Sequence, residues 1–265
     1  MSAMQPIRKN VRWHWIFIVF LSYMMVIPGA WAQHYLTLGA GYSAALLGSD
    51  DLNLFKDTYN GVFGLDLVQP MKGFDVSVGM RWEIGYRRWS KINMAFFLGS
   101  QNFSGTDQAR FYSGERQFTL DVKTYFVEFE AGRTIKKFFI NGVLSVFFKR
   151  DVTLSSIYST SEEESKKALD GTFKGITAVS TDIGIALGYF KEPVCLTAKI
   201  TYPLFTGGGS KTLQDRSPDK MAEGTYIFPD DYEAYLFGEG YQGVKGNIDG
   251  LKFMVTVAFV YKIKK

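Results

Sequence analysis

The stretch FDVSVGMRWEIGY, residues 74–86, decides the fold because its polarity alternates from one residue to the next. Side chains of a β-strand point alternately to its two faces, so this alternation predicts a strand with one apolar and one polar face. The apolar face carries large side chains and the opposite face small, polar or charged ones: Phe74, Val76, Val78, Met80, Trp82, Ile84 and Tyr86 against Asp75, Ser77, Gly79, Arg81, Glu83 and Gly85.

The same pattern recurs in seven further segments, of which LKFMVTVAFVYKI, residues 251–263, is the clearest. In one of them the apolar residues change phase between Val122 and Tyr125, which we interpret as a β-bulge near Lys123-Thr124. Together the segments predict an all-β chain of eight antiparallel strands, each long enough for a tilted membrane span of about 9–11 residues. The other six lie near residues 34–45, 91–103, 117–132, 137–149, 177–190 and 194–205.

The connections between these segments alternate in length. Three are short, at residues 87–90, 133–136 and 191–193. Short turns on one side and long loops on the other are typical of a transmembrane β-barrel whose two termini share the short-turn side. A count of ten strands stays open, since residues 62–68 could pair with part of the last loop. The long connections span residues 46–73, 104–116, 150–176 and 206–249.

The N-terminal segment, residues 1–32, has the order of a secretory signal peptide. Its first twelve residues are polar and basic, an apolar run follows from Trp13 to Ile27, and Ala30-Trp31-Ala32 offers a cleavage site. The apolar run is short for a membrane-spanning helix, which needs about 20 residues, although an N-terminal membrane anchor remains the alternative. Residues 33–265 would then form the mature domain.

The leader, the even strand count, the loop asymmetry and the aromatic-rich last strand resemble the small eight-stranded outer-membrane barrels of the OmpA-transmembrane, OmpX and OmpW kind. The resemblance covers residues 34–263 and is architectural. It implies the outer membrane of a Gram-negative bacterium, contact with lipopolysaccharide and other outer-membrane lipid, and delivery by the barrel-insertion machinery. The chain departs from such barrels by ending on Lys264-Lys265 rather than on an aromatic residue.

We expect the bulky apolar set to face lipid and the small, polar set to face inward. The interior of an eight-stranded barrel is only wide enough to be filled by side chains, so the smaller set fits there. A soluble barrel with the apolar set inside is the alternative. Buried charges must be paired, so we predict a salt-bridged lumen network rather than an open pore. Its candidate members are Arg81, Glu83, Glu128, Glu130, Asp182 and Lys199.

Charge elsewhere is uneven. Without the three basic residues of the leader, 27 basic residues face 26 acidic ones, so the sequence offers no basic footprint for nucleic acid. Basic residues nevertheless gather at the short-turn end, where they could meet anionic lipid headgroups, and we use them to orient the barrel. They are Arg87, Arg88, Lys91, Arg133, Lys136, Lys137, Lys191, Lys264 and Lys265.

The sequence predicts no catalytic residues. Most enzymes of this barrel architecture rely on a histidine as general base, and after the leader the chain has only His34, at the short-turn end. Cys195 is the only cysteine, and its place on the polar phase favours a small core thiol. We therefore predict no catalytic, cofactor or metal site, and a protein that is not an enzyme.

Function is then expected in the long loops. Residues 161–171 predict a short exposed helix by their capping box and charge pairs. The last loop carries aromatic residues that either pack on the rim or bind an extracellular ligand. The expected role is surface binding or envelope integrity, with a narrow transporter of small hydrophobic molecules or a lipid-modifying enzyme as alternatives. The aromatic candidates are Tyr226, Phe228, Tyr232, Tyr235, Phe237 and Tyr241.

Overall fold

The computed structural model describes residues 32–74, 76–159, 170–177, 179–208, 213–215, 244 and 246–263. Nearly all of the leader, most of the predicted helix at 161–171 and all six aromatic candidates between 226 and 241 lie outside these residues. Within the described ranges, no helix is both long and apolar enough to cross a membrane. From Gln33 onward, the described residues belong to a single compact unit.

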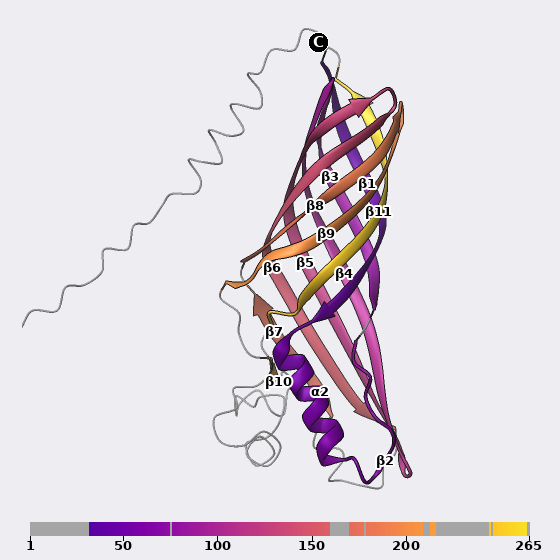
Figure 1. Ribbon diagram of the computed structural model, residues 1–265, viewed down its shortest axis with the longest axis vertical. Helices are drawn as coiled ribbons and strands as arrows, with labels where there is room; N and C mark the ends of the chain where they lie inside the picture. The colour runs from indigo at the N-terminus through magenta and orange to yellow at the C-terminus, as the bar shows by residue number, and fades with distance from the viewer. Residues whose placement is uncertain are drawn as a thin grey trace, which may run out of the picture. The chain divides into compact units, whose positions relative to one another are not determined.

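Eight antiparallel strands form a closed ring (Figure 1). Each strand pairs with its neighbours in sequence order, and two further pairings, β1 with β11 and β6 with β8, complete the circuit. The eight predicted strands are thus confirmed. They are β1 (Gln33–Gly48), β3 (Ser77–Trp89), β4 (Ile92–Phe111), β5 (Gly114–Ile135), β6 (Phe138–Tyr158), β8 (Val179–Lys191), β9 (Val194–Gly208) and β11 (Asp249–Lys262).

Strands β4, β5 and β6 continue well beyond the ring, which corrects the predicted loop at 104–116. Pairing between β4 and β5 runs without a shift from Ile92 opposite Arg133 to Phe111 opposite Gly114. Short strands widen this projecting sheet: β2 (Leu67–Gln69) beside β4, and β7 (Gly171–Thr177) followed by β10 (Gln214–Asp215) beside β6. We call residues 103–122 and 150–158, with β2, β7 and β10, the extension.

The first predicted loop, residues 46–73, contains a helix, α2 (Asp50–Val62), which directly follows β1. The side chain of Ser49 caps it by accepting a hydrogen bond from the backbone of Leu52 at 3.1 Å. Asp50 and Asp51 in the first turn favour a helix start, because their charge complements the helix dipole. Figure 1 shows α2 beside the extension, at the end of the ring remote from the C-terminus.

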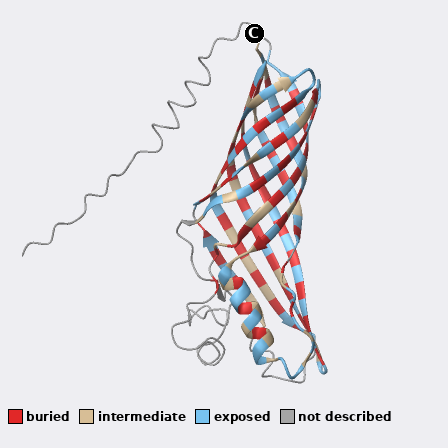
Figure 2. Ribbon diagram, in the orientation of Figure 1, coloured by how far each residue is buried: buried red, intermediate tan, exposed pale blue. Residues whose placement is uncertain are grey.

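In the ring, every second side chain points outward, and most of these outward side chains are apolar, as predicted. The red and pale blue bands of Figure 2 alternate along each strand for this reason. Leu38 on β1 and Phe259 on β11 lie opposite each other and are 62% and 57% exposed. The inward set is small, polar or charged, with inward aromatic rings among it. A ring that is apolar outside and polar inside is the reverse of a soluble barrel.

Strand β5 shows that the predicted bulge at Lys123-Thr124 is wrong. Its even-numbered residues from Arg116 to Glu130 are buried without interruption, so its phase does not change. What changes is the polarity of each face: the inward side is apolar in the extension and largely polar in the ring. The bulge lies on the partner strand β6, where Phe148 and Lys149 are both exposed and the register with β5 shifts.

Candidate functional site

Lys199 lies at the centre of a charge cluster inside the ring. Its Nζ is 2.5 Å from Glu128 Oε1, 2.8 Å from Glu130 Oε1 and 3.3 Å from Glu83 Oε2. Arg81 bridges two of the same carboxylates, at 2.8 Å from both Glu83 and Glu128. None of these five side chains is more than 3% exposed. The structure therefore brings five of the six predicted network residues together.

Arg87 completes this cluster and corrects its placement on the basic outer rim. Its Nη2 is 2.9 Å from Glu130 Oε2, and Asn141 donates to the same oxygen at 3.0 Å. Its side chain is 1% exposed. Three cations now balance three carboxylates in a neutral group, which we call the central cluster: Arg81, Arg87, Lys199, Glu83, Glu128 and Glu130.

Asp182 does not join the central cluster, contrary to the prediction. It pairs with Lys252 at 2.7 Å in a second neutral group, in which Arg150 holds Asp249 at 2.7 Å and Lys252 also contacts Asp249. Sequence reasoning missed its partners because Arg150 and Asp249 were assigned to long loops. We call these four residues the extension-side cluster. Lys252 carried a usable signal, since it lies on the polar phase of the last strand.

Aromatic rings lie beside the central cluster on both sides, toward the extension and toward the short turns. Phe97, Phe126 and Phe147 form a buried layer, and the guanidinium of Arg81 lies 3.9 Å from the centre of the Phe126 ring. Cation–π contacts of this kind stabilise a desolvated arginine. At the short-turn end, Tyr35 and Phe190 pack edge to face. The described interior thus contains aromatic rings beside the paired charges, on both sides of the central cluster.

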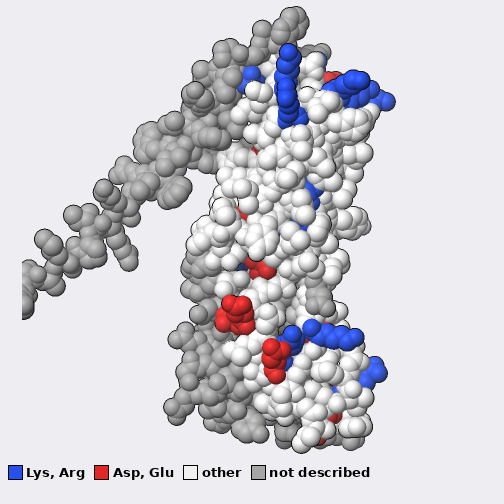
Figure 3. All heavy atoms as spheres, in the orientation of Figure 1, with Lys and Arg blue, Asp and Glu red and all other residues white. Residues whose placement is uncertain are grey.

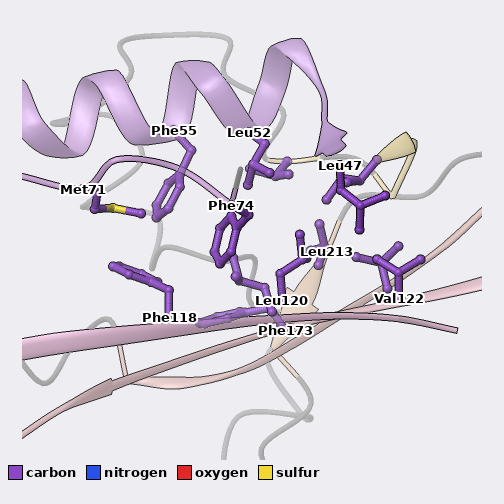
Figure 4. Packing of buried hydrophobic residues seen from close by; sticks show 14 of the residues in the cluster. Leu47, Leu52, Phe55, Met71, Phe74, Phe118, Leu120, Val122, Phe173 and Leu213 are labelled. Atoms are coloured by element: carbon purple, nitrogen blue, oxygen red, sulfur yellow. The ribbon is translucent and has the colours of Figure 1, made fainter. Parts of the chain in front are cut away.

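The extension has an apolar core of its own, which α2 covers. Phe55 of α2 is 1% exposed and meets Phe118 of β5 edge to face, with ring centres 5.7 Å apart. Figure 4 shows the helix laid over the apolar face of the strands, with these side chains between them. Burial of this apolar face against the extension stabilises α2 as a helix within the segment that had been predicted to be a loop. Further members of this core are Leu52, Tyr59, Met71, Phe74, Leu120, Val122, Val152, Leu154, Phe173 and Leu213.

A buried polar group anchors the far end of this core. Arg116 Nη1 donates to Asp170 Oδ1 and to Ser156 Oγ, each at 2.7 Å, and the backbone of Tyr158 donates to Asp170. Burial raises the pKa of the neighbouring Tyr59 phenol, although the positive charge of Arg116 opposes the shift. The group ties α2, β5, β6 and the start of β7 together.

Asp107 fixes the chain that returns from α2 to the ring. Its carboxylate accepts hydrogen bonds from the backbones of Lys72 at 3.2 Å and Gly73 at 2.8 Å. Gly73 has a φ of 104°, a conformation that side chains with a Cβ disfavour. Asn60 of α2 exchanges two further bonds with the backbone of Met71, both at 2.9 Å. The return segment is therefore held to both α2 and β4.

The remaining candidates from the sequence have modest surroundings. His34 forms a hydrogen bond through Nδ1 with the Tyr86 hydroxyl, and the two rings stack beside the short turns. Cys195 is buried and contacts Thr197. Both lie near the short turns, at the opposite end of the ring from the extension, most of which the sequence had predicted to be loops.

No protein-family model matches this chain, and no curated protein does. Among solved structures, the outer membrane protease OmpT from Escherichia coli is similar, with 9% identity and a TM-score of 0.40. The match covers 88% of this chain and 96% of OmpT.

OmpT is an enzyme, which contradicts our prediction that the present chain is not one, and we withdraw that prediction. The prediction rested on the lack of a well-placed histidine, but carboxylate, lysine and tyrosine side chains also serve as acids and bases. At 9% identity the similarity assigns no activity, substrate or residue role to this chain.

Proposed function

We propose that this chain is an eight-stranded β-barrel of the Gram-negative outer membrane that holds its extension outside the cell as a binding surface. Residues 1–32 serve as the signal peptide, lipopolysaccharide surrounds the outer part of the barrel, and the barrel-insertion machinery delivers it. In this proposal the long connections, including the aromatic residues between 226 and 241, contribute to the surface.

The observation that carries the proposal is the exchange of polarity between ring and extension. On β5 the outward residues of the ring, Tyr125, Val127 and Phe129, suit lipid. The outward residues Gln117 and Asp121, which lie in the extension, suit water. The inward face changes in the opposite sense at the same level. An apolar outer band flanked by aromatic residues is typical of the membrane-spanning part of a barrel, so the change supports a membrane surface near Tyr125.

The filled interior supports anchoring rather than passage through the lumen. Both charge clusters are neutral and buried, so neither offers a free charge to a passing solute. An eight-stranded barrel is narrow enough for side chains to fill it completely. The transporter alternative therefore gains no support from the geometry of the described residues.

Cysteine labelling of intact cells tests the orientation. Gln117→Cys lies on the exposed face of the extension, and Lys91→Cys is its matched control at a short turn. We expect a membrane-impermeant maleimide to label position 117 in intact cells, and position 91 only after the outer membrane is permeabilised. The native Cys195 is buried and gives little background.

The opposite labelling order would overturn the orientation. Recovery of the protein in the soluble periplasm, without a heat-dependent mobility shift on SDS gels, would overturn the membrane assignment as a whole. Incubation of the purified barrel with labelled lipopolysaccharide and phospholipid separates binding from turnover, and turnover would replace the binding role with lipid modification.

A further inference from the structure

The short-turn end of the ring carries a one-sided set of charges. Within the described residues, six exposed cations lie at this end, whereas Glu192 is the only exposed carboxylate there. Figure 3 shows lysines and arginines in blue at the end where the C-terminus lies, with little red beside them, whereas blue and red occur together at the other end. We call the six the cationic collar: Lys91, Arg133, Lys136, Lys137, Lys191 and Lys262.

Backbone hydrogen bonds hold the turns of the collar together. Thr134 N donates to Lys91 O at 3.1 Å, and Phe190 N donates to Lys137 O at 2.7 Å. Val260 N donates to Pro193 O at 2.8 Å, which joins the β8–β9 turn to β11. The bases of the charged side chains are therefore fixed relative to the ring, although the charged ends are free to reach outward.

Lys136 places a positive charge in the β5–β6 turn although its backbone conformation is unfavourable for lysine. It has a φ of 57°, the only positive φ of a non-glycine residue in the described chain. Glycine or asparagine adopts this conformation more easily, because a Cβ there crowds the backbone. The turn nevertheless presents two adjacent lysines, Lys136 and Lys137, to solvent.

The position of the collar identifies its partner. The exposed Phe138 and the half-buried Tyr189, whose tilted rings have centres 5.2 Å apart, belong to the aromatic edge of the apolar outer face. Lys191 follows Tyr189 on the same outward side of β8, immediately beyond that edge. Aromatic residues mark the headgroup level of a membrane, and long basic side chains reach toward phosphates there.

We propose that the cationic collar binds anionic phospholipid headgroups, of the phosphatidylglycerol class, in the leaflet that surrounds the short-turn end. The inference rests on the proposed membrane function and adds a lipid preference to it. The collar gathers anionic lipid around the short-turn end and fixes the depth of the barrel in the bilayer.

Lipid selectivity of the reconstituted protein tests the collar. The proposed mature protein, residues 33–265, is inserted into phosphatidylcholine vesicles. Electron paramagnetic resonance then measures the association of spin-labelled phosphatidylglycerol relative to spin-labelled phosphatidylcholine. One basic side chain near an anionic surface changes association by about fivefold, so we expect a preference for phosphatidylglycerol of about threefold or more. The preference should fall as the salt concentration rises.

Two matched variants locate the effect. The collar variant Lys136→Asn, Lys137→Gln, Lys191→Gln should lose the preference, and asparagine suits the backbone at position 136. The control variant Lys72→Gln, Arg110→Gln, Lys174→Gln removes the same charge from exposed positions at the other end, away from the proposed membrane surface near Tyr125, and should keep the preference. A heat-dependent mobility shift confirms that both variants are folded.

Each remaining outcome decides a specific point. Insertion without any lipid preference, or an equal loss in both variants, overturns the collar and leaves the barrel proposal standing. Failure to insert at all overturns the barrel proposal. Binding of soluble polyglutamate without a preference for phosphatidylglycerol would mean that the collar recognises an acidic protein surface instead.

Discussion

Lys199 shows how single residues hold the lumen together. It contacts all three glutamates of the central cluster, while Arg81 and Arg87 reach two and one of them respectively. A buried charge that loses its partner is costly, because no water replaces the lost contact. The stability of the ring therefore depends on keeping this cluster neutral.

We expect Lys199→Met to destabilise the protein by about 3–5 kcal/mol, since it leaves one buried carboxylate uncompensated. The midpoint of urea unfolding in detergent measures the change. The exposed Lys174→Met should shift the midpoint by less than about 0.5 kcal/mol. Equal effects of the two substitutions would show that the central cluster does not contribute as described.

The double variant Lys199→Met, Glu130→Gln should recover part of this loss, because it restores equal numbers of positive and negative charges. A double-mutant cycle gives the coupling energy, which we expect to be about 0.5–3 kcal/mol in the favourable direction. Additive losses at the two sites would contradict direct pairing between Lys199 and Glu130.

Residue patterns predicted much of the central cluster but not its boundary. Arg81, Glu83, Glu128, Glu130 and Lys199 lie on the polar phase of clear strands, so their inward direction followed from period-two alternation. Arg87 continues the same inward phase of β3, but it lies next to a turn and was grouped with the surface charges there. Pairing across strands depends on register, which alternation in a single strand does not determine.

At the scale of elements, the exchange of polarity along β5 explains both a success and an error. The alternation was strong enough to place the strand, but a change in which phase was apolar was interpreted as a bulge. The strand instead keeps its phase, while its outward face changes from apolar in the ring to polar in the extension. Helix α2 was missed because its apolar face becomes evident only against the extension that it covers.

Truncation of the α2 anchor should loosen the helix without opening the ring. Phe55→Ala removes a buried ring and is expected to cost about 3–5 kcal/mol of local stability. Protease cleavage within residues 50–74 should then increase, while the heat-dependent mobility shift of the ring persists. Leu54→Ala, at a half-exposed position of the same helix, is the matched control and should leave cleavage unchanged.

The docking of α2 should also weaken at high pH. Burial raises the pKa of Tyr59 above that of tyrosine in an unfolded chain, about 10. The stability that the neutral phenol provides is present below pH 10 and is lost as the pH rises toward the folded value. The rate of protease cleavage within residues 50–74 should rise above pH 10. In Tyr59→Phe this rate should rise less steeply with pH. An identical profile in that variant would exclude Tyr59 as the cause.

For the whole molecule, the described residues place two groups of paired charges and several aromatic rings inside the ring, between the short turns and the extension. We expect the purified protein to give no stable conductance steps in planar bilayers, because a filled eight-stranded barrel leaves no continuous water path. Insertion is confirmed on the same sample by protease protection. Reproducible single-channel steps from the folded protein would contradict the filled interior.

The uninterrupted pairing of β4 with β5 has a consequence for how such proteins diversify. A hairpin without a register shift can gain two residues on each strand and keep every side chain on its original face. Each such insertion raises the tip by about 7 Å along the strand and leaves the ring untouched. The height of the turn at Tyr112-Ser113 is thus an adjustable quantity, through which natural variation can change the reach of the extension independently of its anchor.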